Sequence, residues 1–212
     1  MKKIVFFGDS ICFGQGISIQ NGWIPRFASF IESMTKKNKS QSFIIRNNSV
    51  NGDTTRKALE RINYDVFSQG VEIAIIQFGL NDCNFWNDDK GLPRVLPNSF
   101  RENLIEIITR LIHHKCEHIF LLTNHPTKLK KNNKTDRKYD ENNRTYNHLI
   151  RAVSRKFSRN LISLVDIEKY FINKSVKNCI LSDGIHLNLK GHDLYLEIFL
   201  DKFKKHLNRK NF

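Results

Sequence analysis

Short apolar runs alternate with longer amphipathic stretches over the whole chain, and this alternation limits the fold more than any other feature. Several runs are continuous in Ile, Val, Phe and Leu, as is typical of strands that are covered on both faces. Five strands are predicted, at Lys3–Phe7, Phe43–Asn47, Glu72–Phe78, His118–Thr123 and Leu161–Val165. Five helices are predicted, at about Trp23–Lys37, Thr54–Tyr64, Ser99–His114, Glu141–Phe157 and Leu189–His206. This order predicts an α/β fold with a mostly parallel sheet and helices on both of its faces, joined by right-handed crossovers.

Some helix starts carry capping residues of their own. Asn98 or Ser99 is expected to cap the helix that ends near His114, with Glu102 as the capping-box partner. Asp53 and Thr54 are expected to cap the helix after the second strand in the same way.

The chain is long enough for one domain with a substantial core, so residues 1–212 are predicted to form a single domain. Of its 212 residues, 40% are hydrophobic and 26% are charged, and 16 are Phe, which indicates a globular chain rather than a disordered one. We find no internal repeat and no interdomain linker. Lys128–Tyr139 is predicted to be a mobile surface loop, and whether it closes over a site is left open. Gly79–Pro97 carries enough apolar residues to be ordered.

The chain is strongly basic, with 35 Lys and Arg against 21 Asp and Glu and a net charge of +14. Lysines spread over many helix faces explain this charge without any partner. The alternative is an anionic substrate or surface, such as an acidic glycan, a phospholipid or nucleic acid. Of the two densest basic runs, Lys128–Lys138 contains no aromatic residue and Lys202–Lys210 contains only Phe203, so specific nucleic-acid binding is not expected.

The cysteines and the amino terminus indicate the cellular compartment. Cys12, Cys83, Cys116 and Cys179 lie far apart, without the spacing of a disulfide framework or a zinc site. The first apolar run is interrupted by Asp9, too early for a signal peptide. No apolar run is long enough for a transmembrane segment. We therefore expect a reduced, cytoplasmic protein.

Four short polar segments follow predicted strands or precede the last helix. They are Gly8-Asp9-Ser10, Asn48–Thr54, Phe78–Asp82 and Ser182–Leu187. In open α/β sheets, ligands bind in the crevice outside the carboxyl ends of the strands. A serine, an acid and a histidine in such segments are typical of a serine hydrolase, in which a base takes the proton of the attacking hydroxyl.

Together these segments resemble the SGNH hydrolases, also called the GDSL esterase/lipase family. The family's Ser, Gly, Asn and His blocks match Ser10, Gly52, Asn81 and His186, in family order over residues 8–186. The resemblance implies a three-layer α/β/α flavodoxin-like fold with a central five-stranded parallel sheet, and catalysis without a cofactor or a metal. The G-x-S-x-G motif of the α/β-hydrolases is absent around Ser10 and elsewhere.

The resemblance also assigns roles to the matched residues. Ser10 is the expected nucleophile, His186 the general base, and Asp183 the acid that orients the imidazole. The backbone N–H groups of Ser10 and Gly52 and the side-chain amide of Asn81 are the expected oxyanion hole. Taken alone, His186 reads as an ordinary surface or core histidine, and Gly52 and Asn81 as turn residues.

Other residues near these blocks have less specialised interpretations. Asp9 and Asp82 are expected to support the site by accepting backbone N–H bonds. Cys12 and Cys83 are expected to pack as small apolar groups. His125 either lines a pocket or belongs to a turn with Pro126.

The expected function is hydrolysis of a small-molecule carboxylic ester through an acyl-serine intermediate. Short-acyl or O-acetyl esters, including carbohydrate or acidic ones, are favoured because the chain has no appended binding module. The alternative substrates are lysophospholipids or thioesters with longer acyl chains. A non-catalytic binding module for acidic partners is the alternative outside enzymes. The sequence makes no prediction of oligomeric state.

Overall fold

A single five-stranded sheet forms the centre of the computed structural model, which describes residues 1–38, 42–86, 90–129, 138–173 and 178–209. All strand pairs are parallel, and the strand order is β2-β1-β3-β4-β5. The strands are β1 (Lys2–Gly8), β2 (Phe43–Asn47), β3 (Ile73–Gln77), β4 (His118–Leu122) and β5 (Ile162–Val165). The five strands of the predicted parallel sheet are therefore confirmed, each within two residues of its expected bounds.

Burial follows the position of each strand in the sheet. Every residue of the interior strands β3 and β4 is buried, as their continuous apolar sequences predict. The edge strand β2 has no fully buried residue, and β5 at the other edge is only half buried. The register places Ile4 of β1 between Ile45 and Ile73 of its two neighbours.

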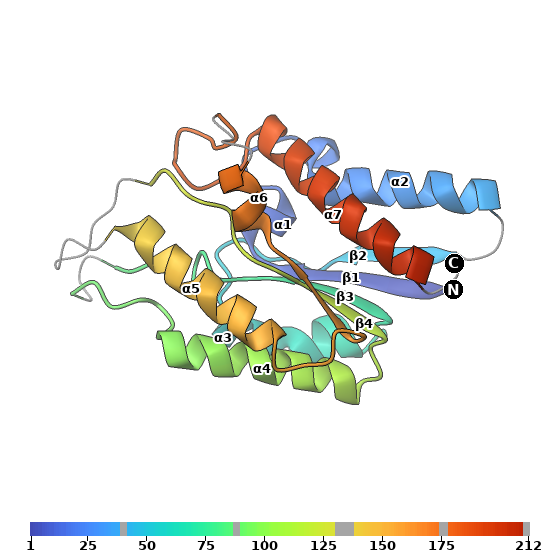
Figure 1. Ribbon diagram of the computed structural model, residues 1–212, viewed down its shortest axis with the longest axis horizontal. Coiled ribbons are helices and arrows are strands. Elements are labelled where there is room, and N and C mark those ends of the chain that lie inside the picture. The colour runs from blue at the N-terminus through green and yellow to red at the C-terminus, as the bar shows by residue number, and fades with distance from the viewer. Residues whose placement is uncertain (39–41, 87–89, 130–137, 174–177, 210–212) are drawn as a thin grey trace.

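Helices cover both faces of the sheet (Figure 1). They are α1 (Ser10–Phe13), η1 (Ile19–Asn21), α2 (Trp23–Asn38), α3 (Thr55–Ile62), η2 (Asn63–Phe67), α4 (Pro97–His113), α5 (Tyr139–Ser154), α6 (Ile167–Asn173) and α7 (Leu189–Arg209). Figure 1 shows α2 and α7 above the sheet and α3, α4 and α5 below it. The structure is therefore the α/β/α sandwich that the resemblance implied.

The chain reverses its direction across the sheet at β1. From β1 it crosses to β2 on one side, and then returns to β3 on the other side of β1. The carboxyl ends of β1 and β3 therefore lie at a topological switch point, where the loops diverge and leave a crevice. The segments that follow these two strands contain Ser10 and Asn81.

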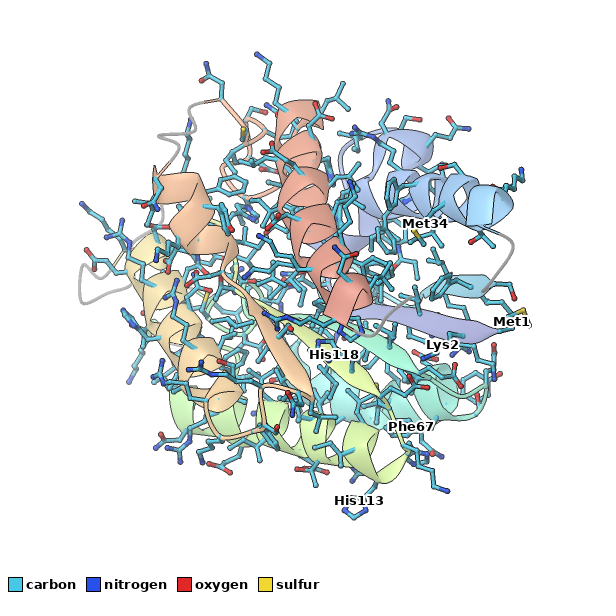
Figure 2. All side chains as sticks on the ribbon, turned by 45° about the vertical axis from the view of Figure 1, so that its right-hand side comes forward. Met1, Lys2, Met34, Phe67, His113 and His118 are labelled. Atoms are coloured by element: carbon cyan, nitrogen blue, oxygen red, sulfur yellow. The ribbon has the colours of Figure 1, made fainter. Side chains whose placement is uncertain are left out.

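Aromatic side chains fill the layer between the sheet and the helices above it. Phe6 of β1 packs edge-on against Trp23 and Phe27 of α2 and against Phe199 of α7, with ring centroids 5.3 to 5.8 Å apart. Figure 2 draws the side chains on the ribbon and labels Lys2 and His118, the first residues of β1 and β4. The polar segments after β1 and β3 lie at the opposite, carboxyl edge of the sheet.

Two capping expectations were wrong. Helix α4 begins at Pro97, without a side-chain cap, because proline is favourable at the first helical position. Asn98 and Ser99 therefore lie inside the helix. Asp53 does not cap α3 but forms an ion pair with Arg61, while the neighbouring Thr54 is the cap, as expected.

Candidate active site

Ser10 is the first residue of α1 and follows β1 after a single linking residue. Gly8 ends the strand at a point of close packing, since a Cβ there would lie 2.8 Å from the carbonyl oxygen of Gln77. Asp9 caps the short helix, and its Oδ1 accepts the N–H of Ile11 at 3.0 Å. Ser10 itself is only 6% exposed. The sheet thus presents the hydroxyl at its carboxyl edge in a largely enclosed position.

Asp183 and His186 lie on the loop before α7 and reach Ser10 across 176 residues of sequence. The Nε2 of His186 lies 3.0 Å from the Oγ of Ser10, and its Nδ1 lies 2.6 Å from the Oδ2 of Asp183. The three side chains form a continuous hydrogen-bonded chain from carboxylate to hydroxyl.

Asp183 also organises its own loop. Its Oδ1 accepts the backbone N–H groups of Ile185 and His186, at 2.8 and 2.9 Å. Partial burial opposes ionisation of this carboxyl, but these hydrogen bonds and the His186 ring outweigh burial and keep the pKa of Asp183 below its usual value. The acid is therefore ionised at neutral pH, as needed to stabilise an imidazolium.

Residues that follow β4 hold this loop from behind. The Lys128 N–H donates to the carbonyl of Gly184 at 2.7 Å. Gly184 has a φ of +77°, and a Cβ there would lie 2.7 Å from the backbone nitrogen of Leu129. Glycine is therefore required on two grounds, backbone conformation and space.

His125 makes a second contact to the same loop. Its Nε2 donates to the Ile185 carbonyl and its Nδ1 accepts from the Tyr195 hydroxyl, both at 2.8 Å. A carbonyl can only accept, which fixes the tautomer. Burial lowers the pKa of His125 to about 4, so the ring is neutral at neutral pH. His125 is fully buried and supports the loop that carries His186, whereas the sequence indicated a turn or a pocket wall.

Gly52 lies in a tight turn after β2. The Asp53 N–H donates to the Val50 carbonyl at 3.2 Å, and Gly52, the third residue of this turn, has a φ of +74°. A Cβ on Gly52 would have no atom within 4 Å, so the space beside it is open. Open space is what a substrate needs to approach a backbone N–H closely.

Asn81 lies in the turn after β3 and is joined to Gly52 through one side chain. Arg94 donates to the Oδ1 of Asn81 at 3.4 Å and to the carbonyl of Gly52 at 3.3 Å. The two nitrogens belong to a single guanidinium, so Asn81 and Gly52 lie side by side. No pattern in the sequence signals Arg94, because its place beside Asn81 depends on contacts that form only in the folded chain.

Asp9 and Asp82 are buried carboxyl groups that both accept backbone N–H bonds. The Oδ1 of Asp82 accepts the N–H and the hydroxyl of Thr55, at 2.9 and 2.5 Å, and so ties the turn after β3 to the start of α3. Burial raises the pKa of Asp82 to about 6. Burial, with a smaller contribution from the Asp82 charge, raises the pKa of Asp9 to about 7.

The remaining candidate groups do not form a site of their own. Among the described residues, no group of three or more His, Cys, Asp and Glu side chains could hold a metal ion. All four cysteines are buried free thiols. Among aromatic residues close in sequence to Ser10 and Asn81, Phe85 is fully buried, whereas Phe13 and Trp86 are about half exposed. Most of the predicted surface loop, residues 130–137, falls outside the described residues.

A parallel α/β/α sandwich with a hydrogen-bonded Ser–His–Asp chain at the carboxyl edge of its sheet is typical of a serine hydrolase. The profile of the GDSL-like Lipase/Acylhydrolase family matches residues 6–194. The chain belongs to this family, which the four sequence blocks indicated, and it is an ester-hydrolysing enzyme.

Individual proteins are similar to this chain over most of its length. The uncharacterized lipoprotein YqeF of Bacillus subtilis (strain 168) is 25% identical over 222 residues, which cover 92% of this chain and 87% of the relative. The crystal structure of the lipase/acylhydrolase from Enterococcus faecalis has a TM-score of 0.75 at 23% identity, covering 97% of this chain and 96% of that one. Axe2, an acetylxylan esterase from Geobacillus stearothermophilus, has a TM-score of 0.71 at 17% identity, covering 94% and 93%. At these identities the two structures confirm the fold.

Proposed function

We propose that the protein is a serine esterase in which Ser10 attacks the ester carbonyl, His186 is the general base and Asp183 orients the imidazole. The hydrogen-bonded chain from Asp183 through His186 to Ser10 is the observation that carries this proposal. We further propose that residues 1–212 form a single hydrolase domain.

The chemistry follows from the atoms that face one another. Nε2 of His186 takes the Ser10 proton as Oγ bonds to the ester carbon, and Asp183 stabilises the imidazolium that forms. The tetrahedral oxyanion is held by the N–H groups of Ser10 and Gly52 and by the Asn81 amide. The imidazolium then gives its proton to the departing alcohol, leaving an acyl-serine. A water molecule, deprotonated by His186 in the same way, releases the acid and restores Ser10.

Short-acyl or O-acetyl esters, including those on carbohydrates, are the proposed substrates. Axe2, a neighbour in fold, is described as an acetylxylan esterase. Phe13, three residues after the nucleophile, and Trp86, five residues after Asn81, expose apolar ring surface on which a sugar can pack. The net charge of +14 would also favour an acidic ester over a cationic one.

Acyl-chain length is the direct test of this proposal. Hydrolysis of p-nitrophenyl acetate, butyrate and octanoate is expected to show kcat/KM falling as the chain lengthens. A parallel assay with O-acetylated xylo-oligosaccharides should release acetate. Preference for octanoate over acetate would overturn the short-acyl claim and favour the lysophospholipase or thioesterase alternative. Labelling of Ser10 by a fluorophosphonate separates both esterase alternatives from a non-catalytic binding module.

A cytoplasmic location remains a proposal that rests on the sequence. Over the described part of the chain, no helix has the length and apolar character needed to cross a bilayer. The relative YqeF is described as a lipoprotein, which points the other way. Fractionation of the native host, followed by immunoblotting of the cytosol and the membranes, distinguishes the two.

A further inference from the structure

Arg94 is the one described side chain that joins two residues of the proposed oxyanion hole. Its two terminal nitrogens donate to the Oδ1 of Asn81 and to the carbonyl of Gly52, at 3.4 and 3.3 Å. These oxygens belong to segments that follow β3 and β2, so no local sequence relationship holds them together. The guanidinium, with its fixed fork of donors, sets their spacing.

The backbone of Arg94 is itself held in place. Its N–H donates to the Asn84 carbonyl at 2.7 Å, and the next N–H, of Val95, donates to the Asp82 carbonyl at 3.1 Å. The Val95 carbonyl accepts the hydroxyl of Tyr146 from α5. The backbone of Arg94 and Val95 is therefore held against the residues that follow Asn81, and this fixes the point from which the guanidinium extends.

The contact to Asn81 determines which way its carboxamide faces. A carboxamide has one accepting and one donating end, and an arginine side chain can only donate. The end of Asn81 that faces Arg94 must therefore be the oxygen, and its NH2 group is directed elsewhere. An oxyanion requires that donating end, so a flipped Asn81 would present a repulsive oxygen to it.

The guanidinium of Arg94 also lies over the ring of Trp86. The guanidinium carbon of Arg94 lies 5.2 Å from the centre of the Trp86 ring. This cation–π contact restricts the guanidinium and shields one face from water, which strengthens its electrostatic interactions.

We propose that Arg94 is a positioning residue, which holds Asn81 with its NH2 group toward the oxyanion and fixes the neighbouring Gly52 turn. This inference rests on the proposed function, because it requires Asn81 to stabilise the oxyanion. Arg94 acts through Asn81 and Gly52 and makes no bond to the reacting atoms.

A double-mutant cycle on a neutral ester tests this coupling. With p-nitrophenyl acetate, Asn81→Ala is expected to lower kcat by about 10²- to 10³-fold, as for loss of one oxyanion donor. Arg94→Met is expected to lower kcat by about 10- to 100-fold, with KM changed less than about twofold, since a misaligned donor retains part of its effect. In the Asn81→Ala background, Arg94→Met should cost much less than it does alone, because the group that it positions is gone.

Matched variants separate positioning from general effects. Arg101→Met removes another cation, which pairs with Glu102 on α4, and should leave kcat unchanged. Arg94→Lys keeps the charge but cannot bridge both oxygens, so it should behave more like Arg94→Met than like the parent. If Arg94→Met does not fold, as judged by thermal unfolding, Arg94→Lys takes its place in the cycle.

The double-mutant cycle has outcomes that support the positioning role of Arg94 and outcomes that contradict it. Non-additive losses in kcat support the positioning role. Additive losses, or an effect confined to KM, overturn it, and an effect on KM alone for acidic esters would mean that Arg94 binds substrate instead. An unchanged kcat in Asn81→Ala is a separate result, which removes Asn81 from the oxyanion hole and so contradicts the proposed function.

Discussion

Ser10 and His186 meet in the site, but the structure holds them by different means. Ser10 follows the interior strand β1, which is paired on both sides, and is almost fully buried. The loop with Asp183 and His186 precedes α7 and does not directly follow a strand of the sheet, and the Asp183 side chain is 46% exposed. This loop keeps its shape through the hydrogen bonds of Asp183 and through contacts from His125 and Lys128.

The two regions should differ in their tolerance of change. A change at the nucleophile removes a reacting atom but leaves the surrounding packing intact. Substitutions of the residues that support the loop should instead reduce activity to different extents, because each would shift His186 by a different amount relative to the fixed Ser10 hydroxyl. Misplacement of a catalytic group by about 1 Å can cost about 10²-fold in rate. Substitutions in both regions test this division, and the most damaging one is at the nucleophile.

Ser10→Ala should abolish turnover and leave stability nearly unchanged. Losing a triad nucleophile costs on the order of 10⁶ in kcat in subtilisin, and the same scale is expected here. Steady-state assays with p-nitrophenyl acetate and thermal unfolding of both proteins measure the two effects. Substantial residual hydrolysis by a purified, folded variant would mean that another residue is the nucleophile.

Asp183→Asn should lower kcat by about 10⁴-fold, the size of loss seen when a triad acid becomes an amide. The oxygen of the new side chain can still accept the Ile185 and His186 N–H groups, so the loop should persist. Its NH2 group cannot accept from Nδ1 of His186, and the tautomer needed for catalysis is lost. A crystal structure of the variant is the control. A loss below about tenfold would leave Asp183 with only the role of shaping the loop.

Gly184→Ala and Gly52→Ala form a matched pair, since both glycines have positive φ. Both variants carry the strain of a left-handed alanine, of roughly 1–2 kcal/mol. Only at Gly184 would the methyl group also collide with backbone, that of Leu129. Gly184→Ala should therefore unfold at a lower denaturant concentration than Gly52→Ala and lose about tenfold or more in kcat through movement of His186. Equal stability of the two variants would show that the loop at Gly184 can move away from Leu129 without lowering the free energy of unfolding.

Asp9→Asn tests the buried region around Ser10, through the pH dependence of the free energy of unfolding. The pKa of Asp9 is raised to about 7, so between about pH 4 and pH 7 the unfolded chain has released this proton while the folded chain keeps it. The free energy of unfolding contributed by Asp9 therefore falls across this window and is level above it. The neutral amide of the variant avoids this loss, so the variant should gain about 3 kcal/mol on the parent between about pH 4.5 and pH 8. Urea unfolding at both pH values measures the gain, and a constant difference would contradict it.

Local patterns predicted most of the fold. Buried strands were found because their apolar runs are continuous, and β2 was placed at its observed bounds, Phe43–Asn47. Helices α1 and α6, of four and seven residues, were missed because they are too short for a hydrophobic period to show. Pro97 marks the start of α4, because proline is favoured at the first helical position, whereas the capping pattern had indicated a start at Asn98 or Ser99.

The candidate site could be predicted from the sequence only where the type of residue indicates its chemistry. Ser10, Asp183 and His186 stand out because a nucleophile, an acid and a base in these blocks are typical of one family. Arg94 and His125 act through contacts to the Asn81 carboxamide and to a backbone carbonyl of another segment. Such partners are brought together only by tertiary folding, so the local sequence around Arg94 or His125 does not predict them.

The separation of 176 residues between Ser10 and His186 has a consequence for synthesis of the chain. During translation, the serine leaves the ribosome long before its histidine is made, and until then it remains an ordinary alcohol. A nascent or truncated chain therefore cannot acylate itself on cellular esters. Hydrolytic activity is therefore expected only after the chain has been made through His186 and has folded around both residues, so activity reports that this folding is complete.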